Sequence, residues 1–183
     1  ANQKSLKYII GDESDVLERI IHCGEIGEAT DIFRITSESP FLYYQAVESL
    51  WIKHQNEELE ATFYDEIVDG CGFEIIKLSA LKQSHKDGKT KHRSELCSLY
   101  IRENKEKFKI HKASAPRFLF RKDLRLTVDN PEDLVLCRAI YKEFIDFAPQ
   151  IPIEKIISFL DKSPHLINLT YPFTEEGYKT MYL

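Results

Sequence analysis

The chain has 183 residues, of which 43% are hydrophobic and 30% are charged, and its formal net charge at pH 7 is -5. This length and composition are typical of one globular domain with a sizeable core. The negative charge argues against nucleic-acid binding, because a protein that contacts the phosphate backbone needs a basic face. No apolar run is long enough for a transmembrane helix, and the polar N-terminus does not have the pattern of a signal peptide, so we expect a cytoplasmic protein without membrane contacts.

Four cysteines lie in or beside apolar segments, and no two of them are close in sequence: Cys23, Cys71, Cys97 and Cys137. This spacing matches neither a disulfide framework nor a CxxC zinc site. We therefore expect buried free thiols in a reducing compartment.

In the first half of the chain, short apolar segments alternate with segments of helical periodicity. The expected strands are 7–11, 30–35, 60–64 and 73–78, and the expected helices begin near Asp12, Phe41 and Ser79. Strands that alternate with helices predict an α/β fold with a mainly parallel sheet.

The second half begins with an expected helix at 94–103 and an expected strand at 108–111. In the loop that follows, Phe118, Leu119 and Phe120 form an apolar patch that we expect to cover a sheet edge or an interface. The remaining expected elements are a strand at 124–128, helices at 130–147 and 153–160, and an aromatic tail without helical periodicity at 163–183.

The stretch from Arg125 to Leu134 has the pattern of a buried strand that ends on Asp129 and turns at once into a helix. Asn130 is a good N-cap, and Pro131 fits the first helical position. A carboxylate at the carboxyl end of a strand in an α/β sheet points to where such sheets bind ligands. Asp129 is therefore the first functional candidate, and the alternative is that it only helps to cap the helix.

A second carboxylate, Glu38, follows the strand predicted at 30–35, so it is expected at the same sheet edge as Asp129. Two converging carboxylates suit Mg²⁺, which takes one or two carboxylates together with substrate phosphates. The pattern thus predicts a site for the magnesium complex of a nucleoside triphosphate. The alternative is that both are exposed loop acids.

Four arginines are candidate partners for phosphate or carboxylate groups, because a guanidinium pairs bidentately with both: Arg34, Arg93, Arg102 and Arg125. Each of them also fits a surface or ion-pair role. The basic loop 86–93 is expected to be solvated surface, and its alternative role is a flap that contacts phosphate. The chain has no Walker A loop, no GxGxxG and no serine nucleophile elbow, so these patterns alone name no reaction.

Several unlike motifs nevertheless agree in order and spacing with one family. They are Gly11-Asp-Glu-Ser-Asp-Val-Leu-Glu-Arg19, Asp31-Ile-Phe-Arg-Ile-Thr-Ser-Glu-Ser-Pro40, Asp69-Gly70 with Phe73-Glu74, Ser94 to Asn104, Arg125 to Leu134, and the closing Glu176-Gly-Tyr-Lys179. The chain resembles the cytidylyltransferases of the spore coat polysaccharide biosynthesis protein F type. These are relatives of the enzymes that make CMP-activated acidic sugars such as CMP-Kdo and CMP-sialic acid.

The resemblance implies a three-layer α/β/α, Rossmann-like nucleotidyltransferase fold of the GT-A-like kind. It implies a magnesium-dependent reaction of an acidic sugar with CTP that gives a CMP-sugar and pyrophosphate, and we expect a homodimer. Glu38 and Asp129 match the metal-binding, catalytic carboxylates of the family. The residues that we assign to substrate binding are Arg34, Glu74, Arg93, Arg102 and Arg125.

The chain departs from the family at its start, where members open with a strand and a glycine-rich, basic loop that cradles the triphosphate. Its first residues match the region of the family's third strand. We therefore expect a fragment of a longer protein, a site shared with another chain, or a diverged relative. Residues 1–148 form the expected nucleotidyltransferase-like domain, incomplete at its N-terminus, and residues 149–183 a C-terminal helix and aromatic tail that pack on the domain or on a partner.

A second departure concerns the site itself. Ser37-Glu38-Ser39-Pro40 stands where the family usually has Gly-Asp-Cys-Pro, and Leu96 stands where members commonly have histidine. These changes put metal binding at Glu38 in question and leave two hypotheses. The protein is either a cytidylyltransferase, of which this chain alone is inactive, or a non-catalytic structural or regulatory module of the same fold.

Overall fold

The computed structural model describes residues 6–180, and for residues 176 and 178–180 it describes the backbone only. These residues form seven α-helices and a sheet of four strands. The chain divides into two compact units. The first unit is Ala1–Phe33, His54–Thr62 and Ile75–His111, and the second is Arg34–Lys53, Phe63–Glu74 and Lys112–Leu183.

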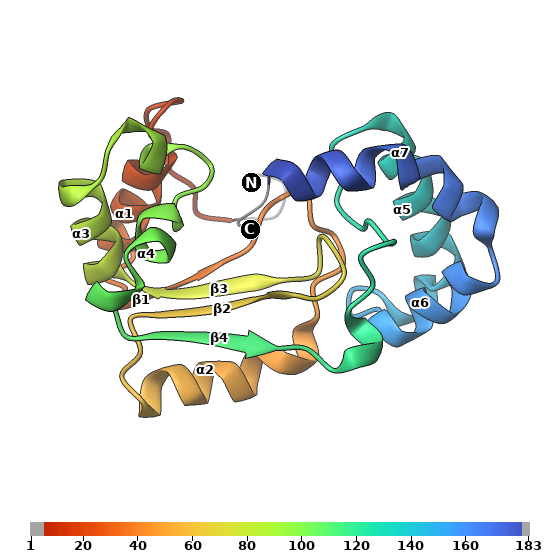
Figure 1. Cartoon of the computed structure of the whole chain (residues 1–183), viewed down its shortest axis with the longest axis horizontal. Coiled ribbons are helices and arrows are strands. Elements are labelled where there is room, and N and C mark those ends of the chain that lie inside the picture. Colours follow the sequence, from red (N-terminus) through yellow and green to blue (C-terminus); the bar gives the residue numbers. More distant parts are fainter. Residues whose placement is uncertain (1–5, 181–183) are drawn as a thin grey trace. The chain divides into compact units, whose positions relative to one another are not determined.

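The sheet has the strand order β1-β3-β2-β4 (Figure 1). Its strands are β1 (Asp31–Arg34), β2 (Ala61–Glu66), β3 (Phe73–Lys77) and β4 (Ile110–Ser114). In β2 and β3 four successive residues are buried, as expected for central strands that are covered on both faces. The predicted strands at 30–35, 60–64, 73–78 and 108–111 are thus present, with small shifts of their ends.

Strand directions follow from the hydrogen bonds and the connections. The short connection between β2 and β3 makes these two strands antiparallel, because a parallel pair needs a longer crossover. The Leu78 N–H donates to Thr30 O (2.8 Å) at one end of the β1–β3 pair, and Arg34 pairs with Glu74 (2.8 Å) at the other end, so β1 is also antiparallel to β3. Glu60 pairs with Lys109, and further along both strands Glu66 pairs with Lys112, so β4 is parallel to β2. Strands β1, β2 and β4 therefore share one direction, and β3 has the opposite one.

The first unit contains the helices α1 (Val16–Ile26), α3 (Leu78–Asp87) and α4 (Leu99–Glu103). Helices α1 and α3 pack against each other (Figure 1). Asp15 caps α1 by accepting a hydrogen bond from the Glu18 N–H (2.8 Å). Asp12, at which we expected the helix to begin, instead accepts the N–H groups of Ser14 and Asp15 and forms the turn before the helix.

The second unit contains the helices α5 (Pro131–Glu143), α6 (Ile153–Asp161) and α7 (Pro164–Thr180), together with most of α2 (Val47–Asn56). Helix α7 packs on α5 and α6 (Figure 1). In α6 the buried side chains recur at helical spacing, which confirms the predicted helix at 153–160: Ile153, Ile156, Ile157 and Leu160. Short 3-10 turns complete the chain at Tyr44–Ala46, Thr90–Arg93, Lys105–Lys107, Arg117–Leu119 and Ile145–Phe147.

Helix α7 corrects the prediction of a non-periodic tail. Leu166, Thr170 and Thr174 are buried at a four-residue spacing, which is the pattern of one helix face. Two of these three positions are threonines, so an apolar periodicity was absent. The threonine hydroxyls donate to helix carbonyls, from Thr170 to Ile167 O (3.4 Å) and from Thr174 to Thr170 O (3.2 Å), which allows them to be buried. Of the tail aromatics, the Tyr178 side chain and Tyr182 lie outside the described residues.

Two predicted strands are wrong. Residues 7–11 are irregular, with Tyr8 and Ile10 exposed, and no described strand pairs with them to satisfy their backbone groups. The stretch 124–128 is buried as predicted, but it forms a single parallel β-bridge, between Arg125 and Asp69, in place of a ladder. The Leu126 N–H donates to Asp69 O within this bridge, whereas the Val128 N–H donates to Glu38 O in a separate loop.

The cysteines are free thiols, and three of them are buried as predicted, whereas Cys23 is exposed on α1. Burial raises the pKa of Cys71 and raises that of Cys137 to about 12, so both stay protonated. In the apolar patch, Leu119 is fully buried while Phe118 and Phe120 are exposed. Among residues 6–180, no helix combines the length and apolar character needed to span a membrane.

Candidate functional site: an arginine-centred carboxylate cluster

The turn at Asp69-Gly70, in the second unit, forms one side of the candidate site. Gly70 has a φ of +84°, and a Cβ atom there would lie 2.6 Å from the carbonyl carbon of Leu126 and from the N of Thr127. Only glycine fits a left-handed turn with backbone this close. The contact is completed by the hydrogen bond from the Leu126 N–H to Asp69 O (2.9 Å), so the turn brings Asp69 to Arg125.

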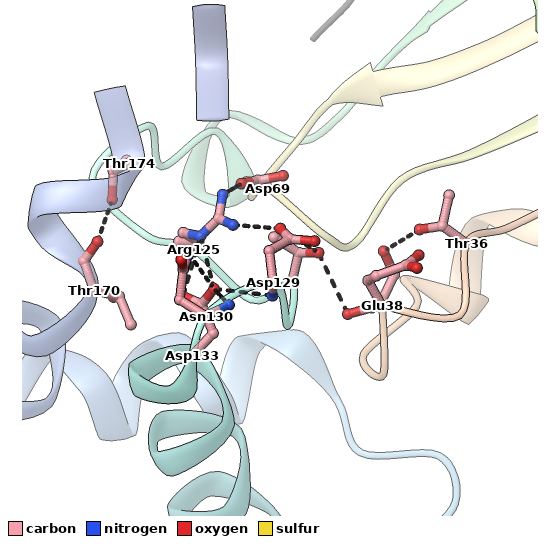
Figure 2. Close-up of polar contacts among 11 residues, drawn as sticks. Thr36, Glu38, Asp69, Arg125, Asp129, Asn130, Asp133, Thr170 and Thr174 are labelled. Carbon is pink, nitrogen blue, oxygen red and sulfur yellow. Dashed lines mark hydrogen bonds and ion pairs between the residues drawn. The ribbon is translucent and has the colours of Figure 1, made fainter. Parts of the chain in front are cut away.

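Arg125 is the centre of the site, and its side chain is only 5% exposed. Each of its three nitrogens pairs with a different aspartate: Nε with Asp133 (3.1 Å), Nη1 with Asp69 (3.1 Å) and Nη2 with Asp129 (Figure 2). Burial disfavours the guanidinium charge, but the three carboxylates outweigh this effect and raise the pKa of Arg125. A buried cation with this many partners is fixed in position, because any rotation breaks an ion pair in a poorly solvated environment.

Asp133 connects the cluster to helix α5. Its carboxylate is fully buried and accepts the N–H groups of Asp129 (3.1 Å) and Asn130 (2.9 Å) as well as the Arg125 guanidinium. With Asn130 it forms the capping box that starts α5, next to Pro131 in the first turn. Burial opposes the charge of Asp133, but the hydrogen bonds from Arg125 and the two backbone N–H groups prevail and lower its pKa.

The pKa of Asp69 is shifted in the opposite direction from that of Asp133. The pKa of Asp69 is raised, first by burial and then by the charges of Asp129 and Asp133, and Arg125 offsets these effects only in part. The two buried aspartates therefore differ, because Asp133 has backbone donors that Asp69 largely lacks. One guanidinium faces three carboxylates, so the cluster as a whole carries an excess of negative charge.

Asp129 is the member of the cluster that reaches solvent, with a side chain that is 50% exposed. Its Oδ2 atom accepts from Arg125 and from the Thr127 hydroxyl (3.4 Å). The Glu38 loop lies directly beside it, because Glu38 O accepts the Val128 N–H (2.8 Å) and is the alternative acceptor, also at 3.4 Å, for the single proton of the Thr127 hydroxyl. The structure thus brings together the loops of the two carboxylates that the sequence singled out, and Figure 2 shows both side chains.

The donor set of this site suits a magnesium ion held jointly with phosphate. Among the residues that the structure describes, no group of three or more His, Cys, Asp or Glu side chains is placed to hold a metal on its own. Glu38 is exposed, and its carboxylate accepts a hydrogen bond from the Ser37 hydroxyl (3.1 Å). Two exposed carboxylates, with phosphate oxygens and water for the remaining positions, are an ordinary set of ligands for Mg²⁺.

Two other predicted substrate-binding residues form an ion pair in the second unit. Arg34 on β1 and Glu74 on β3 lie 2.8 Å apart, and both side chains are largely buried. Arg125 is likewise fully engaged with carboxylates, which suits the holding of Asp129. A direct contact of these three residues with substrate stays a prediction.

The remaining two, Arg93 and Arg102, belong to the first unit. Arg93 donates to Asp15 (3.4 Å) and to the carbonyl of His85 (3.3 Å), and its buried Nε has no hydrogen-bond partner among the described residues. Arg102 donates from Nε to the Ser98 hydroxyl (3.1 Å). Their role in substrate binding also stays a prediction.

Three residues beside Arg125 were missed as site residues: Asp69, Asp133 and Gly177, at which a Cβ atom would lie 2.5 Å from Arg125 Nη1. Asp133 carries the clearest signal, because Asn-x-x-Asp is a capping-box pattern and Arg125, Asp129 and Asp133 follow one another at intervals of four. Asp69-Gly70 and Gly177 lie in motifs that we quoted for the family resemblance. Their contact with Arg125 depends on tertiary structure, so no local pattern reveals it.

Comparison with known proteins shows what the chain is similar to. No protein-family model matches the chain. It is 28% identical over 180 residues to an uncharacterised protein of Methanocaldococcus jannaschii, which covers 97% of this chain and 72% of that protein. It is 23% identical over 171 residues to the spore coat polysaccharide biosynthesis protein SpsF of Bacillus subtilis, with coverages of 88% and 68%.

Among solved structures, a cytidylyltransferase from Leptospira borgpetersenii superposes with a TM-score of 0.80 at 21% identity, over 91% of this chain and 70% of that one. The fold is that of a cytidylyltransferase. This match confirms the predicted Rossmann-like α/β fold and the resemblance drawn from the motifs.

Proposed function

We propose that this protein is a nucleotidyltransferase that activates an acidic sugar with CTP and releases pyrophosphate. The observation that carries the proposal is the exposed Asp129 carboxylate, held by a buried arginine at a site with excess negative charge beside Glu38. Such a site attracts a divalent cation together with its triphosphate. The similarity to a cytidylyltransferase structure and to SpsF supports CTP as the nucleotide and a surface polysaccharide as the destination of the sugar.

In this proposal Asp129 and Glu38 would hold Mg²⁺, which would neutralise phosphate charge and orient the triphosphate. The oxygen of a sugar hydroxyl forms the new bond to the α-phosphorus of CTP and releases its proton to solvent, the bond from that phosphorus to the bridging oxygen breaks, and pyrophosphate leaves. Arg125 keeps the Asp129 carboxylate in place and limits its rotation. A fixed carboxylate matters because misplacement by about 1 Å can cost about a hundredfold in rate.

The deciding test is pyrophosphate release from CTP and Mg²⁺ with a panel of acidic sugars, on the full-length protein. Asp129→Asn keeps the shape and removes the charge, and we expect it to lower turnover at least about a hundredfold, because the metal contributes several kcal/mol to transition-state stabilisation. Asp146→Asn is the matched control, since Asp146 is an exposed aspartate of the same unit. Wild-type turnover in Asp129→Asn would contradict the site assignment.

A second candidate is a non-catalytic module of the same fold, which is favoured by glutamate at position 38 in place of the family's aspartate. Calorimetry with CTP and Mg²⁺ separates the two. Magnesium-dependent CTP binding that is lost in Glu38→Gln supports the enzyme, whereas a folded protein that neither binds CTP nor releases pyrophosphate supports the module. A homodimer and a cytoplasmic location stay predictions, and light scattering tests the first.

A further inference from the structure

Helix α7 contributes a residue without a side chain to the Arg125 cluster. Thr170, Thr174 and Gly177 follow one another at helical spacing, so they lie on one face of α7, and both threonines are buried. A Cβ atom at position 177 would lie 2.5 Å from Arg125 Nη1 and 3.7 Å from Asp69 Oδ2. Carbon contacts are normally about 3.5–4.0 Å, so any side chain at 177 forces the guanidinium to move.

The guanidinium cannot move in any direction without disturbing its ion pairs. The guanidinium is a rigid plane, and its nitrogens are bound to Asp69, Asp129 and Asp133. A displacement of Nη1 therefore also turns Nη2, which holds Asp129. Asp69 and Asp133 cannot follow, because Asp69 lies in the glycine turn against Leu126 and Asp133 is part of the α5 capping box.

We propose that Gly177 is a positioning residue of the Asp129 site: the absence of its side chain leaves the space in which Arg125 holds the Asp129 carboxylate. Helix α7 is then part of the functional site and not only of the core. The inference rests on the proposed function where it is tested by metal binding. The clash between a side chain at position 177 and Arg125, which is the packing component, does not depend on that function.

The packing component is tested by thermal unfolding of Gly177→Ala, Arg125→Lys and the double variant. Alanine is a better helix former than glycine, so without a clash Gly177→Ala should raise the Tm. We expect the Tm to fall, and we expect most of that loss to disappear in the Arg125→Lys background, where Nη1 is absent. A Tm at or above wild type, or losses that add independently, overturns the inference. If Gly177→Ala does not fold, recovery in the double variant supports it and failure to recover overturns it.

The positioning component is tested by Mn²⁺ binding in the presence of CTP, followed by water proton relaxation. Loss of a group that orients a metal ligand typically costs about 10- to 100-fold in metal affinity, and we expect a loss in this range for Gly177→Ala. Glu175→Ala, at an exposed position of the same helix, is the control and should leave the affinity unchanged. Unchanged Mn²⁺ affinity in a folded Gly177→Ala variant overturns the positioning role.

If wild type binds no Mn²⁺ with CTP, the proposed function fails independently of this inference. The positioning of Asp129 is then decided by a thermal cycle of Gly177→Ala with Asp129→Asn. Coupled losses support the inference, and independent losses overturn it.

Discussion

The two units each contain an ion-pair cluster of opposite design. In the second unit one base, Arg125, is shared by three acids and is buried. In the first unit one acid, Asp15, is shared by two bases, His85 (2.9 Å) and Arg93 (3.4 Å), and the Arg93 side chain is 40% exposed. Because water and salt screen exposed pairs but not buried ones, the same chemistry has different consequences in the two places.

The difference shows what a cluster must provide to fix a side chain such as the Asp129 carboxylate. Arg125 has carboxylates on all of its nitrogens, and two of these carboxylates are buried. The exposed third one, Asp129, is therefore held by a group that cannot move. The Asp15 side chain is 14% exposed and its partners His85 and Arg93 are 26% and 40% exposed, so water reaches these contacts and can replace them at a lower cost than in the Arg125 cluster.

The largest expected effect on the free energy of unfolding is in the buried Arg125 cluster of the second unit. Arg125→Ala leaves Asp69 and Asp133 buried without their cation, which costs about 3–5 kcal/mol of unfolding free energy. The control is Arg121→Ala in the same unit, because Arg121 also pairs with two carboxylates, but with the half-exposed Asp123 and Asp161. We expect about 1 kcal/mol or less there. Urea unfolding measures both, and equal losses would refute the distinction.

A smaller and pH-dependent effect separates the two buried aspartates. The pKa of Asp133 is lowered in the folded state, so its stabilisation is complete above the ordinary aspartate pKa of 3.8 and is lost as pH falls through the lower, folded-state value. The difference in stability between wild type and Asp133→Asn should therefore narrow as pH falls from 3.8 to the folded-state pKa of Asp133.

Asp69 should behave in the opposite way, because its pKa is raised in the folded state. Its ionised form costs stability above the folded-state pKa, and protonation removes that cost as pH falls toward 3.8. Relative to Asp69→Asn, wild type should thus gain stability as pH falls through this window. Urea unfolding at several pH values checks both signs, and gaps that move in the same direction would contradict the assignment.

The smallest effect is expected in the first unit. Asp15→Ala removes the N-cap of α1 and both partly exposed contacts, to His85 and Arg93, for a total cost of about 1 kcal/mol, most of it from the cap. Asp15→Ser keeps a capping oxygen and should restore most of the loss. The remainder should vanish at high salt, and a remainder that salt does not change would place this cluster with the buried one.

The fold was largely predictable because periodicity and caps report local structure. Helix α6 and strands β2 and β3 follow from the spacing of their apolar residues, and Asn130 and Pro131 mark the start of α5. Helix α7 was not predicted because it buries threonines, whose hydroxyls donate to the helix backbone. The strand at 124–128 failed because burial alone does not supply a pairing partner.

The candidate site was predictable only in part. Asp129 and Glu38 were found from their places after predicted strands, and the structure brings their loops together through the Val128 N–H. The sequence did not show that Arg125 is buried among aspartates, since Asp69 is far from it along the chain. The closeness of Gly177 to the guanidinium likewise arises only from the packing of α7 in the second unit.

The double role of Asp133 has a consequence for folding. The same carboxylate binds the N–H groups of Asp129 and Asn130 at the start of α5 and the guanidinium that holds Asp129. Initiation of the helix and assembly of the site are therefore one cooperative event, and fraying of the first turn releases both. Amide hydrogen exchange at Asp129 and Asn130 thus reports directly on the assembled site, and a ligand that fixes the Asp129 carboxylate should slow it.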